Sequence, residues 1–171
     1  KGQSIAQIHI HEFVGYQFCQ NLDKEIHNLI EQGTKSLSID LRNNPGGDAH
    51  IAACALDLFL DRDLDLGYLV NIHNNKVDRH FKTNDIKKYD LPIRILINDQ
   101  TKSAAEFFTG IMKYYNRAQI VGRTTYGKGI GQITLAYAQT AHSMLLETQS
   151  MYEYYLPNSI KVDGVGVTPH Q

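Results

Sequence analysis

Residues 93–108 read IRILINDQTKSAAEFF, an apolar run that passes through a polar segment into a second apolar run. The first run, Ile93–Ile97, predicts a buried strand, because short apolar runs bounded by polar residues are typical of strands inside a sheet. After the polar segment, apolar residues recur at helical spacing over 107–112, which predicts a helix. Ser103 therefore lies where a strand gives way to a helix.

Ser103 has two interpretations at this position. As a helix N-cap it would pair with Glu106 in a capping box, a common motif at helix starts. As a nucleophile it would benefit from the free N–H groups and the positive end of the helix dipole, which stabilise a developing negative charge. The local pattern alone favours the cap.

A lysine further along the chain changes that balance. Residues 125–132 read TYGKGIGQ, and the glycines on both sides of Lys128 allow a tight turn that could aim the amine inward. A lysine acts as a general base only when it is neutral, which requires a pKa lowered by burial or by nearby positive charge. Without other context, a solvated turn lysine is the simpler interpretation.

Several separated motifs occur in an order that resembles the tail-specific, or carboxy-terminal processing, serine proteases. They are DLRNNPGG at 40–47, the apolar strand ending at Asn98, SAAE at 103–106 and GKG at 127–129. The likeness extends over roughly residues 5–169. It implies that Ser103 is the nucleophile, that Lys128 is the general base and that Gln132 orients the lysine.

The same resemblance implies an oxyanion hole, a pair of backbone N–H groups that hold the negative oxygen of the reaction intermediate. One donor would be Gly46 or Gly47, which the sequence does not separate, and the second would be Ala104, directly after the nucleophile. Glycine suits this task because it lets the backbone approach a substrate closely. The NNPGG segment is also ordinary turn chemistry for a loop between a strand and a helix. Glu106 is expected to cap the helix or to support the catalytic groups from behind.

Strand and helix patterns alternate through most of the chain, which predicts an α/β layered domain with a β-rich C-terminal part. The resemblance implies the spiral of strand–helix units found in crotonase and the Clp peptidase. Residues 1–171 are expected to form a single core domain. That domain would be either a fragment of a longer protein or a relative without the PDZ module that the resembled proteases usually carry.

The predicted elements follow the chain. A strand at 5–10, a helix at 18–30 and a strand at 37–41 imply a crossover and parallel pairing of the two strands. The remaining predictions are a helix at 51–60, a strand pair at 67–72 and 77–81, a solvated loop at 82–90, a strand at 118–121, and strands at 133–137, 143–148 and 151–156.

Composition narrows the class of protein. The chain has 171 residues and a formal net charge of −1, so nothing indicates disorder or a basic nucleic-acid surface. No apolar run reaches the length of a membrane span. No cofactor or metal is expected, the expected partner is a polypeptide substrate, and the oligomeric state is left open. The resemblance implies an exported protein, although no signal segment precedes the motifs.

The two cysteines and two of the histidines are candidates for a disulfide or a metal site. Cys19 and Cys54 lie on apolar helical patterns, which favours two free buried thiols, because cysteine behaves as a small hydrophobe. A disulfide between them stays open from spacing alone. His9 and His11 alternate around one residue and share a strand face, but no further ligand completes a metal-binding spacing.

Three residues near the motifs need separate interpretation. Lys102 stands where the resembled family usually has a small residue, and it could crowd the site or supply positive charge near Lys128. His170 stands where the family's closing segment has an aspartate. Arg42 is interpreted as a partner in a structural ion pair, with no catalytic role.

Two other functions use related folds: a catalytically silent binding module and an acyl-CoA enzyme of the crotonase superfamily. Fold alone does not decide among them. Neither alternative requires the pair of Ser103 and Lys128. The pair therefore favours a serine endopeptidase that cleaves unfolded or C-terminally tagged proteins by acyl transfer.

Overall fold

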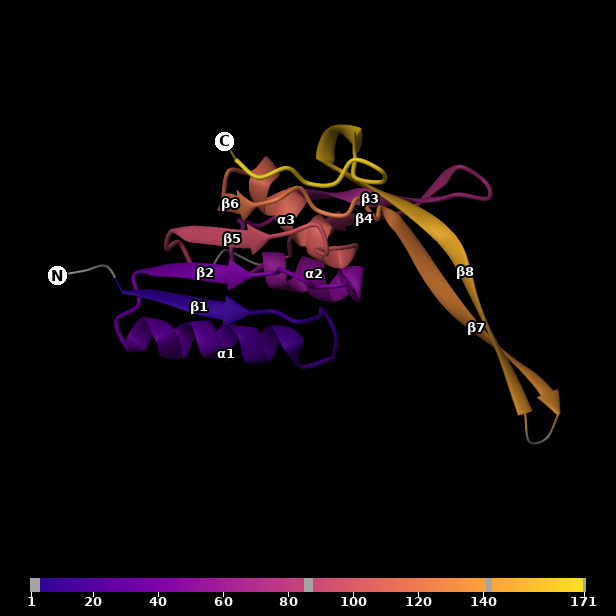
Figure 1. Ribbon diagram of the computed structural model, residues 1–171, viewed down its shortest axis with the longest axis horizontal. Helices are drawn as coiled ribbons and strands as arrows, with labels where there is room; N and C mark the ends of the chain where they lie inside the picture. Colours follow the sequence, from indigo (N-terminus) through magenta and orange to yellow (C-terminus); the bar gives the residue numbers. More distant parts are fainter. Residues whose placement is uncertain (1–3, 85–87, 141–142, 171) are drawn as a thin grey trace.

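The strands of the protein form two sheets, shown in Figure 1. The computed structural model describes residues 4–84, 88–140 and 143–170. The first sheet is parallel, in the order β1-β2-β5-β6, and consists of β1 (Ile5–His9), β2 (Ser36–Asp40), β5 (Ile93–Ile97) and β6 (Gln119–Gly122). The second is antiparallel, in the order β4-β3-β8-β7, and consists of β3 (Asp65–Asn71), β4 (Lys76–Lys82), β7 (Ile130–Thr140) and β8 (Ser143–Leu156), with β9 (Ile160–Lys161) paired to β8.

In the described part of the chain, three α-helices pack on this framework: α1 (Phe18–Glu31), α2 (Ala49–Leu56) and α3 (Ala104–Tyr114). Helix α1 connects β1 to β2 and buries Leu22 and Ile26. The predicted strand–helix–strand unit with parallel pairing is therefore confirmed. A short 3-10 helix, η1 (Pro157–Ser159), ends β8 at the proline.

Helix α3 is the central element of the fold. Every residue from Ala104 to Met112 is buried, because the helix contacts α2 and strands of both sheets. This stretch is mostly apolar, and its two polar side chains, Glu106 and Thr109, are hydrogen-bonded, so it can lie in the interior. Its N-terminal end, which begins at Ser103, therefore has a fixed position relative to both sheets.

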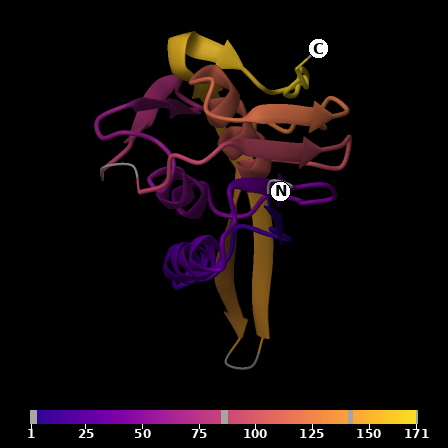
Figure 2. The same cartoon turned by 90° about the vertical axis from the view of Figure 1, so that its left-hand side faces the viewer.

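Strands β7 and β8 project from the body as a paired arm, which Figures 1 and 2 show from two sides. The sequence predicted two separate strands at 143–148 and 151–156, but the structure has one continuous strand, β8. The polar residues Gln149 and Ser150 do not break it, because both pair with β7 and an exposed ladder tolerates polar side chains.

Two further predictions differ from the structure at their boundaries. The helix predicted at 51–60 begins at Ala49 and ends at Leu56, and the buried residues Leu58, Phe59 and Leu60 follow in a turn. The apolar residues of this run are buried in the core although they lie in a turn, so an apolar run at this position does not have to be helical. The strand pair predicted around 72–77 is present as β3 and β4. Residues 85–87 of the predicted loop at 82–90 lie outside the described residues.

The predicted α/β class with a β-rich C-terminal part is confirmed by these layers. The largest buried side chains, Phe13, Phe59 and Phe108, meet where α3 faces the parallel sheet and α2. Among the helices of the described residues, none is long and apolar enough to cross a membrane.

Cys19 and Cys54 form a disulfide between α1 and α2, so the prediction of two free thiols is wrong. Both residues lie on helices, as predicted. The helices pack against each other and place the two Cα atoms 6.3 Å apart, within the span of a disulfide. Spacing along the chain could not reveal this, because only the tertiary packing of α1 against α2 brings the thiols together.

Replacing both cysteines with serine should lower the free energy of unfolding by about 4 kcal/mol, because the disulfide closes a long loop in the unfolded chain. For a domain of this size, that loss corresponds to a fall of roughly 10 °C in Tm. Calorimetry of the double variant checks this, with reduced wild-type protein as the control. A wild-type Tm that does not respond to reduction would contradict the prediction.

Candidate active site

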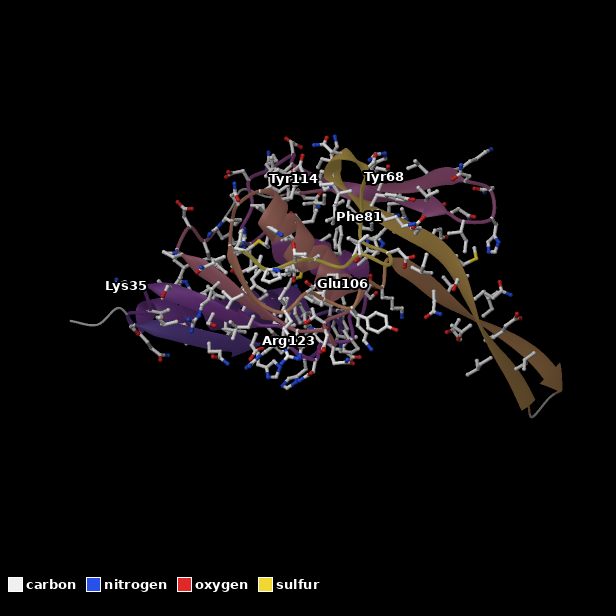
Figure 3. The ribbon with its side chains drawn as sticks, turned by 45° about the horizontal axis from the view of Figure 1, so that its top comes forward. Lys35, Tyr68, Phe81, Glu106, Tyr114 and Arg123 are labelled. Carbon is white, nitrogen blue, oxygen red and sulfur yellow. A yellow bond between two sulfur atoms is a disulfide. The ribbon has the colours of Figure 1, made fainter. Side chains whose placement is uncertain are left out.

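A cavity of about 460 Å³ lies where α3 and β7 begin. Its lining includes most of the residues that the sequence predicted to act together: Gly47, Ser103, Ala104, Lys128 and Gln132. Phe107 of α3 and side chains from three further elements, Leu69, Phe81 and Tyr154, form much of the remaining wall. Of these, Phe81 is labelled in Figure 3. The cavity thus combines a polar reactive side with an apolar wall.

Ser103 is the N-cap of α3 and has φ 53° and ψ −122°. This conformation is rare for a residue with a side chain and costs on the order of 1–3 kcal/mol. Neighbouring bonds hold it in place, because the N–H of Lys102 donates to the carbonyl of Asn44 at 2.9 Å and the hydroxyl of Thr101 donates to the carbonyl of Leu41 at 2.8 Å. Backbone strain of this kind is typical of catalytic nucleophiles on sharp strand-to-helix turns.

Positions 46 and 47 require glycine, because their backbone lies very close to neighbouring segments. Both have positive φ, at 110° and 127°. A Cβ on Gly46 would lie 2.7 Å from the Cβ of Ser103, and a Cβ on Gly47 would lie 2.3 Å from the carbonyl oxygen of Phe13. The loop therefore packs between Ser103 on one side and the segment after β1 on the other, and no side chain fits at either position.

The two glycines differ in the use of their N–H groups. The N–H of Gly46 donates to the side-chain oxygen of the buried Asn44 at 2.8 Å, and the Asn44 amide in turn donates to the carbonyl of Ile10 at 2.8 Å. Within the part of the chain that the structure describes, the N–H groups of Gly47 and Ala104 have no acceptor. Both residues line the cavity, so two unpaired donors are available there.

Glu106 is fully buried and holds the site together from behind. Its carboxylate accepts the N–H groups of Ser103 at 2.9 Å, Gly127 at 2.6 Å and Lys128 at 2.8 Å, and the hydroxyl of Thr125 at 2.5 Å. The bond to Ser103 is the carboxylate half of the predicted capping box. The cap interpretation and the catalytic interpretation are therefore compatible. Figure 3 labels Glu106 near the middle of the molecule.

Lys128 and Gln132 lie on the same side of the cavity. The amine of Lys128 donates to the side-chain oxygen of Gln132 at 3.3 Å. Among the described residues, no hydrogen bond joins the Lys128 amine to the Ser103 hydroxyl. Catalytic hydrogen bonds are often long before substrate binds, so the shared cavity and the contact with Gln132 are the informative observations.

The C-terminal segment supports the lysine turn. The N–H of Gly164 donates to the carbonyl of Gly127 at 2.9 Å, and the carboxylate of Asp163 accepts the N–H of Gly129 at 3.1 Å. The end of this segment is attached to β6, because the ring Nδ1 of His170 accepts the N–H of Ile120 at 2.8 Å. An aspartate could accept the same bond, so the histidine replaces it without loss of an acceptor.

The two cations near the motifs have partners of their own. The Lys102 amine lies 4.3 Å from the centre of the Tyr126 ring. Arg42 forms the expected ion pair with Asp40, with two nitrogen–oxygen contacts at 2.6 and 2.9 Å. These bonds from Arg42 lower the pKa of Asp40. Lys102 is not part of the cavity lining, so it does not crowd the site.

Sequence reasoning missed Tyr154, whose hydroxyl donates to the carbonyl of Ser103 at 3.2 Å. Burial raises its pKa well above the usual value, and the carboxylates of Glu106 and Asp163 act in the same direction. Tyr154 therefore remains a hydrogen-bond donor. Sequence reasoning also missed Phe13, whose backbone forms a β-bridge with Gly47. Nothing in the local sequence pattern connects these two residues.

The described residues contain no cluster of metal-binding side chains. Across residues 4–84, 88–140 and 143–170, no group of three or more His, Cys, Asp or Glu side chains is arranged to hold a metal ion. The rings of His9 and His11 lie 4.0 Å apart.

The sequence of residues 4–171 matches the family model of peptidase family S41. The chain belongs to peptidase family S41. A probable CtpA-like serine protease of Staphylococcus saprophyticus is 35% identical over 151 residues, which cover 86% of this chain and 29% of that protein. The probable CtpA-like serine protease of Staphylococcus aureus is 34% identical over 142 residues, which cover 81% and 27%. This S41 chain therefore spans less than a third of the length of these relatives.

Solved structures show the same fold for the S41 chain. A photosystem II D1 C-terminal processing protease superposes with a TM-score of 0.78 at 23% identity, over 96% of this chain and 41% of that one. Mature CPAF superposes with a TM-score of 0.78 at 18% identity, over 97% and 46%. Together with the family match, these relatives confirm the resemblance to carboxy-terminal processing proteases.

Glu106→Gln should destabilise the protein by about 3 kcal/mol or more. The amide has one acceptor oxygen where the carboxylate has two, so some of the four donors become buried without a partner. Urea unfolding measures the change. Glu31→Gln is the matched control, because Glu31 is 68% exposed and should change stability by less than about 0.5 kcal/mol. Equal midpoints for the two variants would contradict the role given to Glu106.

Proposed function

We propose that this S41 domain is a serine endopeptidase in which Ser103 is the nucleophile and Lys128 the general base. One observation carries the proposal: a strained serine shares one cavity with a lysine and two unpaired backbone N–H groups. The serine and the lysine supply a nucleophile and a base, and the N–H groups supply an oxyanion hole. Gln132 would orient the lysine through the contact with its amine.

The reaction would be acyl transfer in two stages. The neutral Lys128 amine takes the proton of the Ser103 hydroxyl as the oxygen attacks a peptide carbonyl carbon. The resulting ammonium gives that proton to the leaving amine when the peptide bond breaks. Water, activated by the same lysine, then releases the acyl group from Ser103. No cofactor is needed for either stage.

Gly47 and Ala104 would hold the oxyanion. Gly47 is preferred to Gly46 because the N–H of Gly46 is already bonded to Asn44. In comparable sites, one such donor contributes about 3–4 kcal/mol to transition-state stabilisation. The position of the Gly47 N–H is set before substrate binds, since the glycine loop packs against the backbone around Ser103 and Phe13.

The proposed substrate is an unfolded or C-terminally tagged polypeptide with an apolar side chain in the cavity, as the apolar wall suggests. We further propose that the protein works outside the cytoplasm, where disulfides such as Cys19–Cys54 persist. The strand–helix units of the parallel sheet support the proposed relation to the crotonase and Clp spiral.

Ser103→Ala and Lys128→Ala should each abolish hydrolysis of an unfolded protein substrate while the protein stays folded. The double variant should be no worse than either single variant, because the two residues act as a unit. Lys102→Ala is the matched control, since it removes a neighbouring lysine that lies outside the cavity. Gln132→Ala should cause a smaller loss. Near-normal cleavage by either dyad variant would overturn the assignment.

The rate of hydrolysis should rise from neutral to mildly alkaline pH. Only the neutral form of the lysine can accept the serine proton, and that form increases as pH rises. Initial rates on one peptide across this range, with circular dichroism to confirm that the fold is unchanged, make the measurement. A rate that peaks in acid would indicate a carboxylate or histidine base instead.

A further inference from the structure

A second hollow of about 350 Å³ adjoins the active-site cavity. The two hollows share His50 and Phe81 as lining residues. Arg79 and Lys82 of β4 line the second hollow. A peptide that extends past the cavity wall at His50 and Phe81 would therefore enter a region lined by these two cationic side chains and by one acid, Asp57.

His50 and Arg79 are directly joined across this boundary. The Arg79 Nη1 lies 3.0 Å from the His50 Nε2, and the His50 ring packs edge-on against Phe81 with centroids 5.2 Å apart. A guanidinium can only donate, so the His50 Nε2 accepts the bond and the ring is neutral with its proton on Nδ1. Both side chains thus keep N–H donors beyond the bond that joins them.

Arg79 has no carboxylate partner within the described residues. Arg42 and Arg117 differ in this respect, since Arg42 pairs with Asp40 and Arg117 donates to three backbone carbonyls. The bond to His50 uses only one of the five N–H groups of Arg79.

Two acids, Asp48 in the first cavity and Asp57 in the second hollow, already have structural bonds. The carboxylate of Asp48 accepts the N–H of His50 at 2.7 Å and caps α2. The carboxylate of Asp57 accepts the N–H of Asn84 at 2.9 Å. Asp57 lines the second hollow together with Arg79, but among the described residues no ion pair joins Arg79 to Asp48 or to Asp57, so neither acid occupies the unused donors of the guanidinium.

We infer that Arg79 and His50 form a subsite that binds a carboxylate of the peptide substrate beside the cavity. The inference rests on the proposed peptidase function. The planar fork of arginine matches a carboxylate with two parallel N–H bonds, and the His50 Nδ1–H supplies a further donor. The carboxylate comes either from an Asp or Glu side chain or from the C-terminus of the substrate. Because both residues are exposed, the gain is modest, about fivefold.

The test uses two series of peptides that share an apolar residue for the cavity. In the first, a single glutamate moves through successive positions, and each peptide has a glutamine counterpart. In the second, the chain ends at successive positions with either a free carboxylate or an amide. Both kcat/KM with the wild-type protein and binding to the Ser103→Ala protein are measured for each pair.

The expected result is a preference of about fivefold for the carboxylate at one position or two adjacent positions, which Arg79→Gln removes. The series that shows it identifies the source of the carboxylate. Arg79→Lys should keep only part of the preference, because lysine lacks the planar fork. Lys76→Gln is the matched control: it removes a charge from the same strand but lines neither hollow, and it should keep the preference.

Two results would overturn the inference: equal values for acid and neutral peptides at every position, or a preference that survives Arg79→Gln. Either is distinct from a failure of the proposed function, which would show as no cleavage that depends on Ser103. Binding to the Ser103→Ala protein still decides the subsite in that case, because it needs no turnover.

Discussion

The buried carboxylate of Glu106 is the interaction on which the site depends. It joins the start of α3 to the turn at 125–128, two segments that approach each other only in the folded protein. A buried charge is costly unless its hydrogen bonds are satisfied, and four donors satisfy this one. Ser103 and Lys128 are therefore positioned by the same group, because the carboxylate accepts the backbone N–H of each.

A second constraint is the absence of side chains at Gly46 and Gly47. Their backbone packs against Ser103 and Phe13 so closely that a Cβ would overlap at either position. Asn44 completes the arrangement, because its side chain occupies the N–H of Gly46 and is anchored to the end of β1. The N–H of Gly47 is left unpaired in the cavity, and a fixed unpaired donor stabilises developing charge without reorganisation.

Differences from the sequence-based expectations occur where distant contacts override local pattern. The helix expected at 51–60 ends at Leu56, since Phe59 is buried in the following turn against Phe108. The C-terminal segment also acts through long-range contacts, because it supports the lysine turn and is attached to β6 through His170. None of these contacts produces a periodic pattern of apolar residues in the sequence, so they could not be predicted from local pattern.

By itself, the sequence determined the alternation of strands and helices, the position of Ser103 at a strand-to-helix junction and the glycine turn around Lys128. These are local properties, set by apolar periodicity and by the backbone freedom of glycine. Only the tertiary structure decided that Cys19 bonds to Cys54, that Gly47 rather than Gly46 has an unpaired N–H, and that Arg79 lies beside the cavity. The disulfide and the position of Arg79 depend on segments far apart in the chain, and the Asn44 side chain that occupies the Gly46 N–H is itself held by the distant carbonyl of Ile10.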